Sequence, residues 1–490
     1  MSQSINTNVM SLTAQRNASR TSGDLSTAMA RLSSGLRINT AKDDAAGLAI
    51  SERFTSQIRG LNQAARNAND AISLSQTAEG ALGTMSSNLQ RIRELAVQSA
   101  NATNNSTDRK ALQQEVTQLA SELDRVAKTT QFNGKNLFDG TFGTQAYQVG
   151  ANANQVINTT MVNARTTSYG NYDLGGNGVT AAAGGWGTNG IAAGTATISG
   201  SLGSSTVNVS AGQTAKDVAN NINLVSGSTG VNASARTELE VGFAAAGAYS
   251  LTLRSDNTTA QTLSFTLTAN ATADGLNSAL SAINEHSAKT GVTATLNGTA
   301  DKIILTNETG NDVLLSDTAT QNAGNVTVSK READGDTTAA VTLTANTTAN
   351  DALVSGYITL DSEKSFSAVN SATGGFFSNT SANATLSAVA DVDVSTFTGA
   401  TKAMKIMDSA LQFLNNERAK LGALQSRFES TVSNLAVASE NLTASRGRIQ
   451  DADFAKETAA LSRAQVMQQA ATAMIAQANQ GPQAILSLLR

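Results

Sequence analysis

A seven-residue repeat of apolar residues near the end of the chain constrains the fold more than any other feature of the sequence. The spacing holds without a break, and Leu424 and Ala438 fill the second apolar position of the repeat. Such a repeat is typical of a coiled-coil helix, and this one predicts a helix about 65 Å long at 1.5 Å per residue. The repeating residues are Met407, Leu414, Leu421, Phe428, Leu435, Leu442 and Ile449.

The beginning of the chain can supply partner helices for this seam. Residues 1–130 are rich in Ala, Leu, Gln, Ser and Arg, and two apolar runs with steps of three and four residues predict two helices. Asn104 to Asp108 provide turn chemistry between them, so the runs form a helical hairpin. Taken alone, this zone also fits an ordinary helical bundle; together with the seven-residue repeat, it predicts that both ends pack as one paired rod. The runs are Leu82, Met85, Leu89, Ile92 and Ala96, then Leu112, Val116, Leu119, Leu123 and Val126.

Residues 33–51 predict a joint between two helical pieces. Gly35 and Gly47 flank a cluster of charged residues there, and a glycine costs roughly 1 kcal/mol against alanine inside a helix. Further along, Phe132–Lys135 and Phe138–Thr141 place Asn-Gly and Asp-Gly between apolar residues. This is a strong hairpin signal, so we expect two β-hairpins.

The middle of the chain, residues 175–395, has a different composition. It is rich in Gly, Ser, Thr, Asn and Ala, carries more acidic than basic residues, and contains short alternating runs that predict strands. Disorder is the alternative, because both charge and bulky apolar content are low.

An internal repeat argues for order. Two stretches with the same landmarks predict strands, a short helix and strands, and the second has about one more helical turn; a third start at Thr348-Ala349 is weaker. The landmarks are Thr214-Ala215, Val218, Ile222-Asn223, Thr229-Gly230-Val231 and Ala233, then Thr272-Ala273, Leu276, Ile283-Asn284, Thr290-Gly291-Val292 and Ala294.

Nothing in the sequence indicates catalysis, a metal site or a cofactor. The chain has no cysteine and one histidine, His286, which we expect at a solvated helix end; Asp312 and Asp317 are interpreted as solubilising surface residues. No nucleotide-binding loop, nucleophile elbow or carboxylate pair is present. The net charge of −4 does not indicate a surface for binding nucleic acid, and no apolar run is long enough to insert into a membrane.

Several motifs at the two ends of the chain closely resemble those of bacterial flagellins. They are residues 33–51, Ala65–Asp70, Gln90–Asn101, Phe132–Gly134, and Gln477–Gln480 through Leu488–Arg490. An adhesin or surface-layer protein would share the β-rich middle but usually has a cleaved leader, which the start of this chain lacks. An intracellular coiled-coil scaffold would explain the helices but not the large insertion between them.

The resemblance implies an α+β fold in which terminal coiled-coil helices form a paired rod and a β-rich variable region is inserted between the halves. The expected segments are an inner-core helical segment (1–45), rod helices with β-hairpins (46–174), the variable region (175–395), a rod helix (396–450) and an inner-core helix (451–490).

The resemblance also implies the function: a structural subunit of the flagellar filament, which serves swimming. Such a subunit is secreted unfolded by the flagellar type III apparatus and assembles extracellularly through its termini. The implied partners are other copies of the chain, an export chaperone, the filament cap and the hook–filament junction proteins, and Toll-like receptor 5 of an animal host.

Two sets of residues are expected to carry these functions: the first by resemblance, and the second because the apolar residues at the two ends lack enough neighbours to be buried in an isolated subunit. Receptor recognition falls on Arg91, Leu95 and Glu115, where Arg91 and Leu95 share a helix face and Glu115 lies on the helix that folds back beside it. Polymerisation is assigned to Ile5, Val9, Leu12, Ile485, Leu486, Leu488, Leu489 and Arg490.

Overall fold

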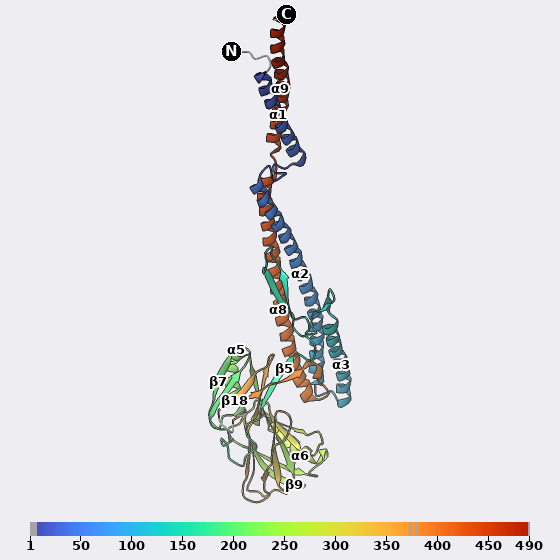
Figure 1. Ribbon diagram of the computed structural model, residues 1–490. Helices are drawn as coiled ribbons and strands as arrows, with labels where there is room; N and C mark the ends of the chain where they lie inside the picture. Colours follow the sequence, from blue (N-terminus) through green and yellow to red (C-terminus); the bar gives the residue numbers. More distant parts are fainter. Residues whose placement is uncertain (1–6, 372–374, 378–380, 489–490) are drawn as a thin grey trace. The chain divides into compact units, whose positions relative to one another are not determined.

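The fold is that of a computed structural model, which describes residues 7–371, 375–377 and 381–488 (Figure 1). The chain divides into two compact units. The first comprises residues 1–79, 142–161 and 419–490, and the second comprises residues 80–141 and 162–418. Two long helices, α2 (Ala45–Ser99) and α8 (Phe397–Gln450), contribute residues to both units. No helix in the described ranges is long and apolar enough to cross a membrane.

Helix α8 confirms the long helix predicted from the seven-residue repeat. In the second unit Met407 and Leu414 are fully buried, and in the first unit Phe428 is fully buried, with its ring edge-on to Tyr147 at a centroid distance of 5.8 Å. The last two repeat positions, Leu442 and Ile449, are only partly buried.

The predicted helical hairpin is also confirmed. Its first apolar run lies in α2 and is buried in full, and its second lies in α3 (Ser106–Thr129). The turn residues do what their chemistry predicts: Asn105 caps α3 by accepting hydrogen bonds from the backbone N–H groups of Thr107 and Asp108, at 2.8 and 2.9 Å. The carboxylate of Asp108 accepts the N–H of Asn105 in return at 3.1 Å, which completes a capping box.

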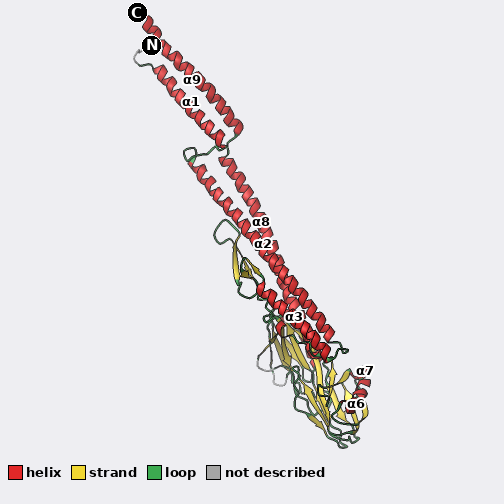
Figure 2. Cartoon of the chain, turned by 90° about the vertical axis from the view of Figure 1, so that its right-hand side faces the viewer, coloured by secondary structure: helices red, strands yellow, loops and turns green. Residues whose placement is uncertain are grey.

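The joint at residues 33–51 is confirmed and lies beside a second break. Helix α1 (Val9–Ser34) ends at Gly35, whose φ of +72° is left-handed, and α8 ends at Gln450 before α9 (Phe454–Leu488) begins. The two breaks are hydrogen-bonded to each other, because Arg37 N–H donates to the carbonyl of Gln450 at 2.7 Å and Ala452 N–H donates to that of Gly35 at 2.9 Å. On the side of the joint that carries the two termini, α1 and α9 lie side by side (Figures 1 and 2).

Gly47 lies within the first turn of α2 rather than in the joint. The Asp44 carboxylate caps α2 there by accepting Gly47 N–H at 2.8 Å. A Cβ at Gly47 would collide with Asp44 and would stand 2.6 Å from Ile38 Cδ1, so the close approach of the capping residue requires glycine.

One predicted hairpin forms and the other does not. Strands β1 (Gln131–Phe132) and β2 (Lys135–Asn136) pair across Asn133 and Gly134, which both have positive φ as a type I′ turn requires. The hairpin predicted at Phe138–Thr141 is wrong. Phe138 is buried, and Asp139 bonds locally to Asn136 and Thr141, so the segment is a bend without paired strands. In the first unit β3 (Thr144–Gln148) and β4 (Val156–Thr160) form a hairpin of their own.

Residues 175–395 are called here the β-rich region. Its described residues, 175–371, 375–377 and 381–395, form strands and short helices around apolar cores, so the disorder alternative is wrong for them. Their strands, together with β5 (Gly170–Gly176), form two four-stranded sheets and one eight-stranded sheet over two apolar cores. The strand bounds are β6 Gly194–Ser199, β7 Ser204–Val209, β8 Asn232–Phe243, β9 Gly247–Arg254, β10 Gln261–Leu267, β11 Val292–Leu296, β12 Ile303–Asn307, β13 Val313–Asp317, β14 Val326–Arg331, β15 Val341–Leu343, β16 Asp351–Val354, β17 Tyr357–Ser362, β18 Ser367–Asn370, β19 Ala382–Asn383 and β20 Thr385–Ala388, followed by the short helix η1 Val389–Asp391.

The internal repeat is confirmed in two copies. In the first, α4 (Ala215–Leu224) and α5 (Ser226–Thr229) lie between β7 and β8, and in the second α6 (Ala273–Glu285) and α7 (Ser287–Thr290) lie between β10 and β11. Each copy ends its helices at a left-handed glycine, Gly230 or Gly291. His286 lies at the boundary of α6 and α7, as predicted. The third copy predicted at Thr348-Ala349 is wrong, because that segment leads directly into β16 without a helix.

The two copies are held by the same side-chain bonds. Asn223 donates to the carbonyl of Ala233 and accepts its N–H, both at 2.8 Å. Asn284 does the same with Ala294 at 3.0 and 2.8 Å. One asparagine in each copy therefore fastens the helix to the strand that follows it.

Candidate functional site

Helices α1 and α9 of the first unit carry most of the residues predicted for polymerisation. Polar contacts join them at three levels: Asn8 Nδ2 donates to the carbonyl of Ala478 at 2.7 Å, Ser11 Oγ contacts Asn479 Oδ1 at 2.9 Å, and Arg31 pairs with Glu457 at 3.3 Å. These bonds fix which faces of the two helices meet.

The structure leaves two of the predicted apolar residues, Val9 and Leu12, open to solvent. Val9 is 67% exposed and Leu12 is 50% exposed, although both are aliphatic. Ile485, Leu486 and Leu488 lie on the last two turns of α9. Ile5, Leu489 and Arg490 lie outside the described residues.

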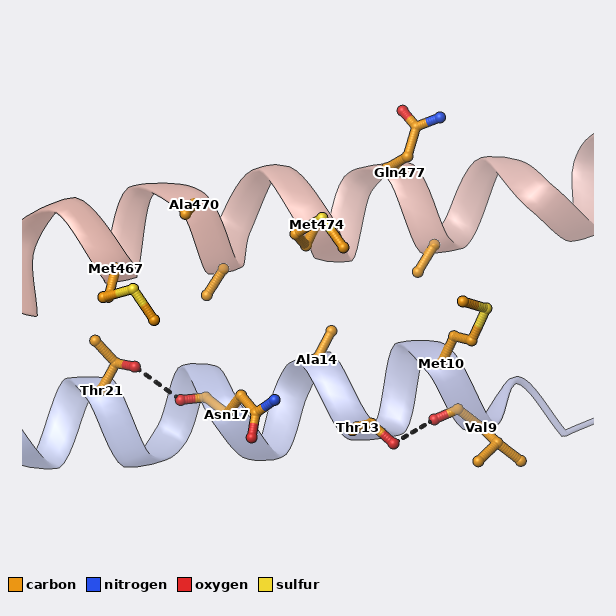
Figure 3. Close-up of a pocket in the computed structure, with 12 residues that line it drawn as sticks. Val9, Met10, Thr13, Ala14, Asn17, Thr21, Met467, Ala470, Met474 and Gln477 are labelled. Carbon is orange, nitrogen blue, oxygen red and sulfur yellow. Dashed lines mark hydrogen bonds between the residues drawn. The ribbon is translucent and has the colours of Figure 1, made fainter.

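Between the two helices lies an apolar groove of about 580 Å³ (Figure 3). Its methionines were missed by sequence reasoning, although Met467 and Met474 stand seven residues apart, the spacing of one helix face. The two lining hydroxyls shown bonded in Figure 3 already donate hydrogen bonds within α1: Thr13 donates to the carbonyl of Val9 and Thr21 to that of Asn17, at 2.8 and 2.9 Å. The lining residues are Val9, Met10, Thr13, Ala14, Asn17, Thr21, Met467, Ala470, Ala471, Met474, Gln477 and Ala478.

The residues predicted for receptor recognition lie in the second unit, and two of the three come together. Arg91 of α2 donates from Nε and Nη2 to one carboxylate oxygen of Glu115 on α3, at 3.0 and 2.9 Å, and from Nη1 to Glu94 at 3.1 Å. These bonds raise the pKa of the Arg91 guanidinium, chiefly through Glu115. Both side chains remain about half exposed. Leu95 differs, because it is 1% exposed and packs inside the helical bundle.

The interpretation of Asp312 and Asp317 as solubilising surface residues is wrong, since each is only 3% exposed. Burial raises the pKa of Asp312 to about 7, against a hydrogen bond from Asn189 Nδ2 at 2.9 Å that lowers it. Asp312 directly precedes the buried strand β13, and this position in the fold, rather than its residue type, decides its environment.

A lysine is buried in the same region. Lys330 of β14 has no exposed surface, and its ammonium donates to the carbonyls of Val179 and Gly356 at 2.9 and 3.2 Å, to Ser355 Oγ at 3.1 Å, and also to the carbonyl of Asn177. Burial lowers its pKa to about 8. Its hydrogen-bond acceptors are mostly backbone carbonyls, so this cluster joins segments of the fold rather than forming a reactive centre. Within the described ranges, no group of His, Asp and Glu side chains could hold a metal ion.

Comparison with known proteins gives three matches to family models. Residues 5–143 match the bacterial flagellin N-terminal helical region, residues 404–489 match the bacterial flagellin C-terminal helical region, and residues 197–257 match the flagellin hook IN motif. The last match covers the first copy of the internal repeat.

Relatives match along the whole chain. The B-type flagellin of Pseudomonas aeruginosa is 47% identical over 502 residues, with 100% of both chains covered, and flagellin B of Vibrio cholerae is 33% identical over 489 residues, again with 100% of both covered. Among solved structures, the FliC protein of Burkholderia pseudomallei is 21% identical, with 73% of this chain and 99% of that chain covered and a TM-score of 0.28. The chain therefore belongs to the bacterial flagellins, the extracellular structural subunits of the flagellar filament, which are not enzymes.

Proposed function

We propose that this chain polymerises into a helical filament that serves swimming, and that its terminal helices α1 and α9 are the parts that join one copy to the next. The observation that carries this proposal is the apolar groove between α1 and α9 with aliphatic and methionine side chains exposed along it. Head-to-tail contact between non-identical patches gives an open filament when the rotation between subunits does not close a ring.

The joining residues proposed are those predicted from the sequence together with the groove. Val9 and Leu12 are exposed in the single chain, and burying such a side chain fully contributes roughly 1.5–3 kcal/mol. Ile5, Ile485, Leu486, Leu488, Leu489 and Arg490 complete the set. The proposed segments remain 1–45 and 451–490 for the inner core, 46–174 and 396–450 for the rod, and 175–395 for the variable region.

The test of this proposal is Val9→Gln in the full-length chain. We expect the concentration of monomer needed for filament growth to rise at least tenfold, because a polar group would have to be buried in each contact. Leu202→Gln is the matched control: Leu202 is 69% exposed, as Val9 is 67% exposed, but it lies in the β-rich region. Growth of Val9→Gln at the wild-type concentration would show that α1 is not a joining surface.

Export and assembly partners are proposed on the basis of the family. The chain leaves the cell unfolded through the flagellar type III apparatus, an export chaperone covers α9 until then, and the filament cap and hook–filament junction proteins meet the ends of the polymer. Without cysteine, the chain has no disulfide to reduce before it is threaded through a conduit. Fractionation tests the route: the chain should appear in the fluid sheared from cells and remain in the cell pellet when the apparatus is inactive.

We also propose that the monomer is a ligand of Toll-like receptor 5, with Arg91 and Glu115 at the contact. The Arg91–Glu115 pair supports this, because it is about half exposed and already ordered by two hydrogen bonds, with a third from Arg91 to Glu94. Leu95 was included as an apolar contact, but its side chain is only 1% exposed in the single chain.

Arg91→Ala tests the receptor proposal. Truncating an interface anchor commonly costs about 2 kcal/mol, near thirtyfold in affinity, so the potency of the monomer in a receptor-reporter assay should fall by about that factor. Arg125→Ala is the control, because Arg125 is likewise an exposed arginine paired with a glutamate, Glu122. Equal potency of both variants, with helicity unchanged, would remove Arg91 from the contact.

A further inference from the structure

The exposed methionines of the described chain gather on the terminal helices. Met10, Met467 and Met474 line the groove between α1 and α9 and are 77%, 54% and 62% exposed (Figure 3). Met29 is 56% exposed on α1 but does not line the groove. Met85 and Met407, by contrast, are fully buried in the helical bundle.

An exposed thioether is open to oxidation by a hydroperoxide. The sulfur lone pair attacks one peroxide oxygen, so that an S–O bond forms while the O–O bond breaks, and the departing hydroxide takes the proton from the oxygen now on sulfur to leave as water. The thioether is oxidised and the peroxide is reduced. The product is a sulfoxide, which is polar where the thioether was apolar, and which sulfoxide reductases convert back.

We propose that Met10, Met467 and Met474 make this groove a reversible, oxidation-sensitive assembly surface, so that a subunit carrying sulfoxides there does not add to a filament. This inference rests on the proposed function of the groove in joining copies. A sulfoxide oxygen needs a hydrogen-bond donor when it is buried. The lining offers few, because most of it is Ala, Met and Val, and the hydroxyls of Thr13 and Thr21 already donate to their own helix. The side-chain amides of Asn17 and Gln477 are the remaining donors in the lining.

The location of these three side chains makes the effect specific. Oxidation at Met29 adds a polar group to a surface outside the groove, and Met85 and Met407 are shielded by packing, so neither class should change assembly. Leucine fills nearly the volume of methionine and cannot be oxidised, and such swaps usually cost little stability.

The experiment treats full-length monomer with dilute hydrogen peroxide, removes the peroxide, and measures elongation from filament seeds by light scattering. Peptide mass spectrometry locates the added oxygen. We expect wild type to be oxidised at the three groove methionines and Met29 well before Met85 and Met407, and to elongate at least tenfold more slowly. After the same peroxide treatment, the Met29→Leu control should elongate as slowly as treated wild type.

The triple variant Met10→Leu, Met467→Leu, Met474→Leu should keep its untreated rate after peroxide, although Met29 is still oxidised. In addition, sulfoxide reductases of both epimer specificities should restore elongation of oxidised wild type. Unchanged elongation of wild type with groove sulfoxides, equal loss in the triple variant, or no recovery after the sulfoxides are removed would overturn the inference. The Val9→Gln variant separates a failure of this inference from a failure of the proposed function. If Val9→Gln blocks filament growth while groove sulfoxides do not, only this inference fails. If the Val9→Gln variant grows normally, the proposed function fails as well.

Discussion

The paired helices α1 and α9 bury little of their apolar surface within one chain, whereas the β-rich region buries most of its own. In α1 only Ser11 and Ala28 are buried, and in the part of α9 whose side chains are described, residues 454–480, only Ala464 is buried. The β-rich region instead closes its apolar side chains into two cores and even encloses Lys330 and Asp312.

This difference separates what each region needs in order to be stable. Helical stability in proteins comes mostly from packing of an apolar face, and α1 and α9 have only one neighbour each to pack on. If α1 and α9 join one copy to the next, as proposed, other copies of the chain cover these apolar faces. The β-rich region buries its apolar surface within a single chain, so assembly is not required to hold it together.

Lys330→Met should give the largest effect and tests whether the β-rich region is complete in one chain. Removing the ammonium takes away the donor of the Asn177 and Gly356 carbonyls and of the Ser355 hydroxyl, while the Val179 carbonyl keeps its hydrogen bond from Ser355 Oγ at 3.3 Å. Each buried acceptor left without a partner costs about 1–3 kcal/mol. Trp186, the one tryptophan of the chain, lies 4.1 Å from the Arg254 guanidinium in the same region, so its fluorescence reports urea unfolding there.

In the same variant, the part of the circular dichroism signal that comes from α1 and α9 should be lost at the same urea concentration as in wild type. Lys289→Met serves as the control because Lys289 lies on the short helix α7 outside the buried cluster. Loss of both signals together in Lys330→Met would mean that the two regions unfold as one and that the contrast between them does not hold.

The pH dependence of stability should come next in size. Folded Asp312 has a pKa raised to about 7, against 3.8 for an ordinary Asp, so the folded state holds the proton between these values and its stability falls as pH rises. The loss is on the order of 4 kcal/mol by pH 8. For Lys330 the folded pKa is lowered to about 8 from 10.5, so the unfolded state binds more protons above pH 8 and stability rises again with pH.

The β-rich region should therefore be least stable between about pH 7 and pH 8, as read from Trp186 fluorescence in urea at several pH values. Asp312→Asn should flatten the fall between pH 4 and pH 7 and leave the rise above pH 8. A wild-type profile that climbs from pH 4 to pH 7 would contradict a neutral, buried Asp312.

The repeat offers a smaller and internally matched test. Asn284→Ala removes two hydrogen bonds to the backbone of Ala294, which should cost about 1–2 kcal/mol because these partly buried groups lose their partners. Asn223→Ala removes the same two bonds in the first copy, and we expect a loss of similar size in urea unfolding. A loss confined to one variant would show that the copies differ in what holds them.

The repeat also shows what a sequence can predict. Its landmarks recur because each local bond needs a particular residue: a capping threonine, an asparagine that fastens the strand, and a glycine with positive φ. The seven-residue repeat of α8 and the capping of α3 are local in the same sense. Such features depend on neighbours within a few turns, and their predictions were confirmed.

The errors arose where distant segments decide the outcome. The Asp-Gly pair at residues 139–140 resembles a hairpin turn, but burial of Leu137 and Phe138 determines the path of the chain there. Asp312 follows the same rule, because its place directly before the buried strand β13 encloses it. Leu95, which lies near Arg91 in sequence, is enclosed by the bundle for the same kind of reason. The groove methionines were missed because an exposed and a buried methionine have the same sequence signature until the second helix is placed.

The smallest expected effect is the sharpest test of the contrast. Leu12→Ala in the monomer should change the free energy of unfolding by less than about 0.5 kcal/mol, because Leu12 is half exposed and loses little packing. The same substitution at Leu360, which is fully buried in the β-rich region, should cost about 2–5 kcal/mol. Circular dichroism for Leu12→Ala and Trp186 fluorescence for Leu360→Ala measure the two losses. In filaments the order should change, since contact with further copies buries Leu12, and Leu12→Ala should then raise the monomer concentration needed for growth. If Leu12→Ala already costs the monomer as much as Leu360→Ala does, α1 is packed before assembly, and its apolar face is not reserved for other copies.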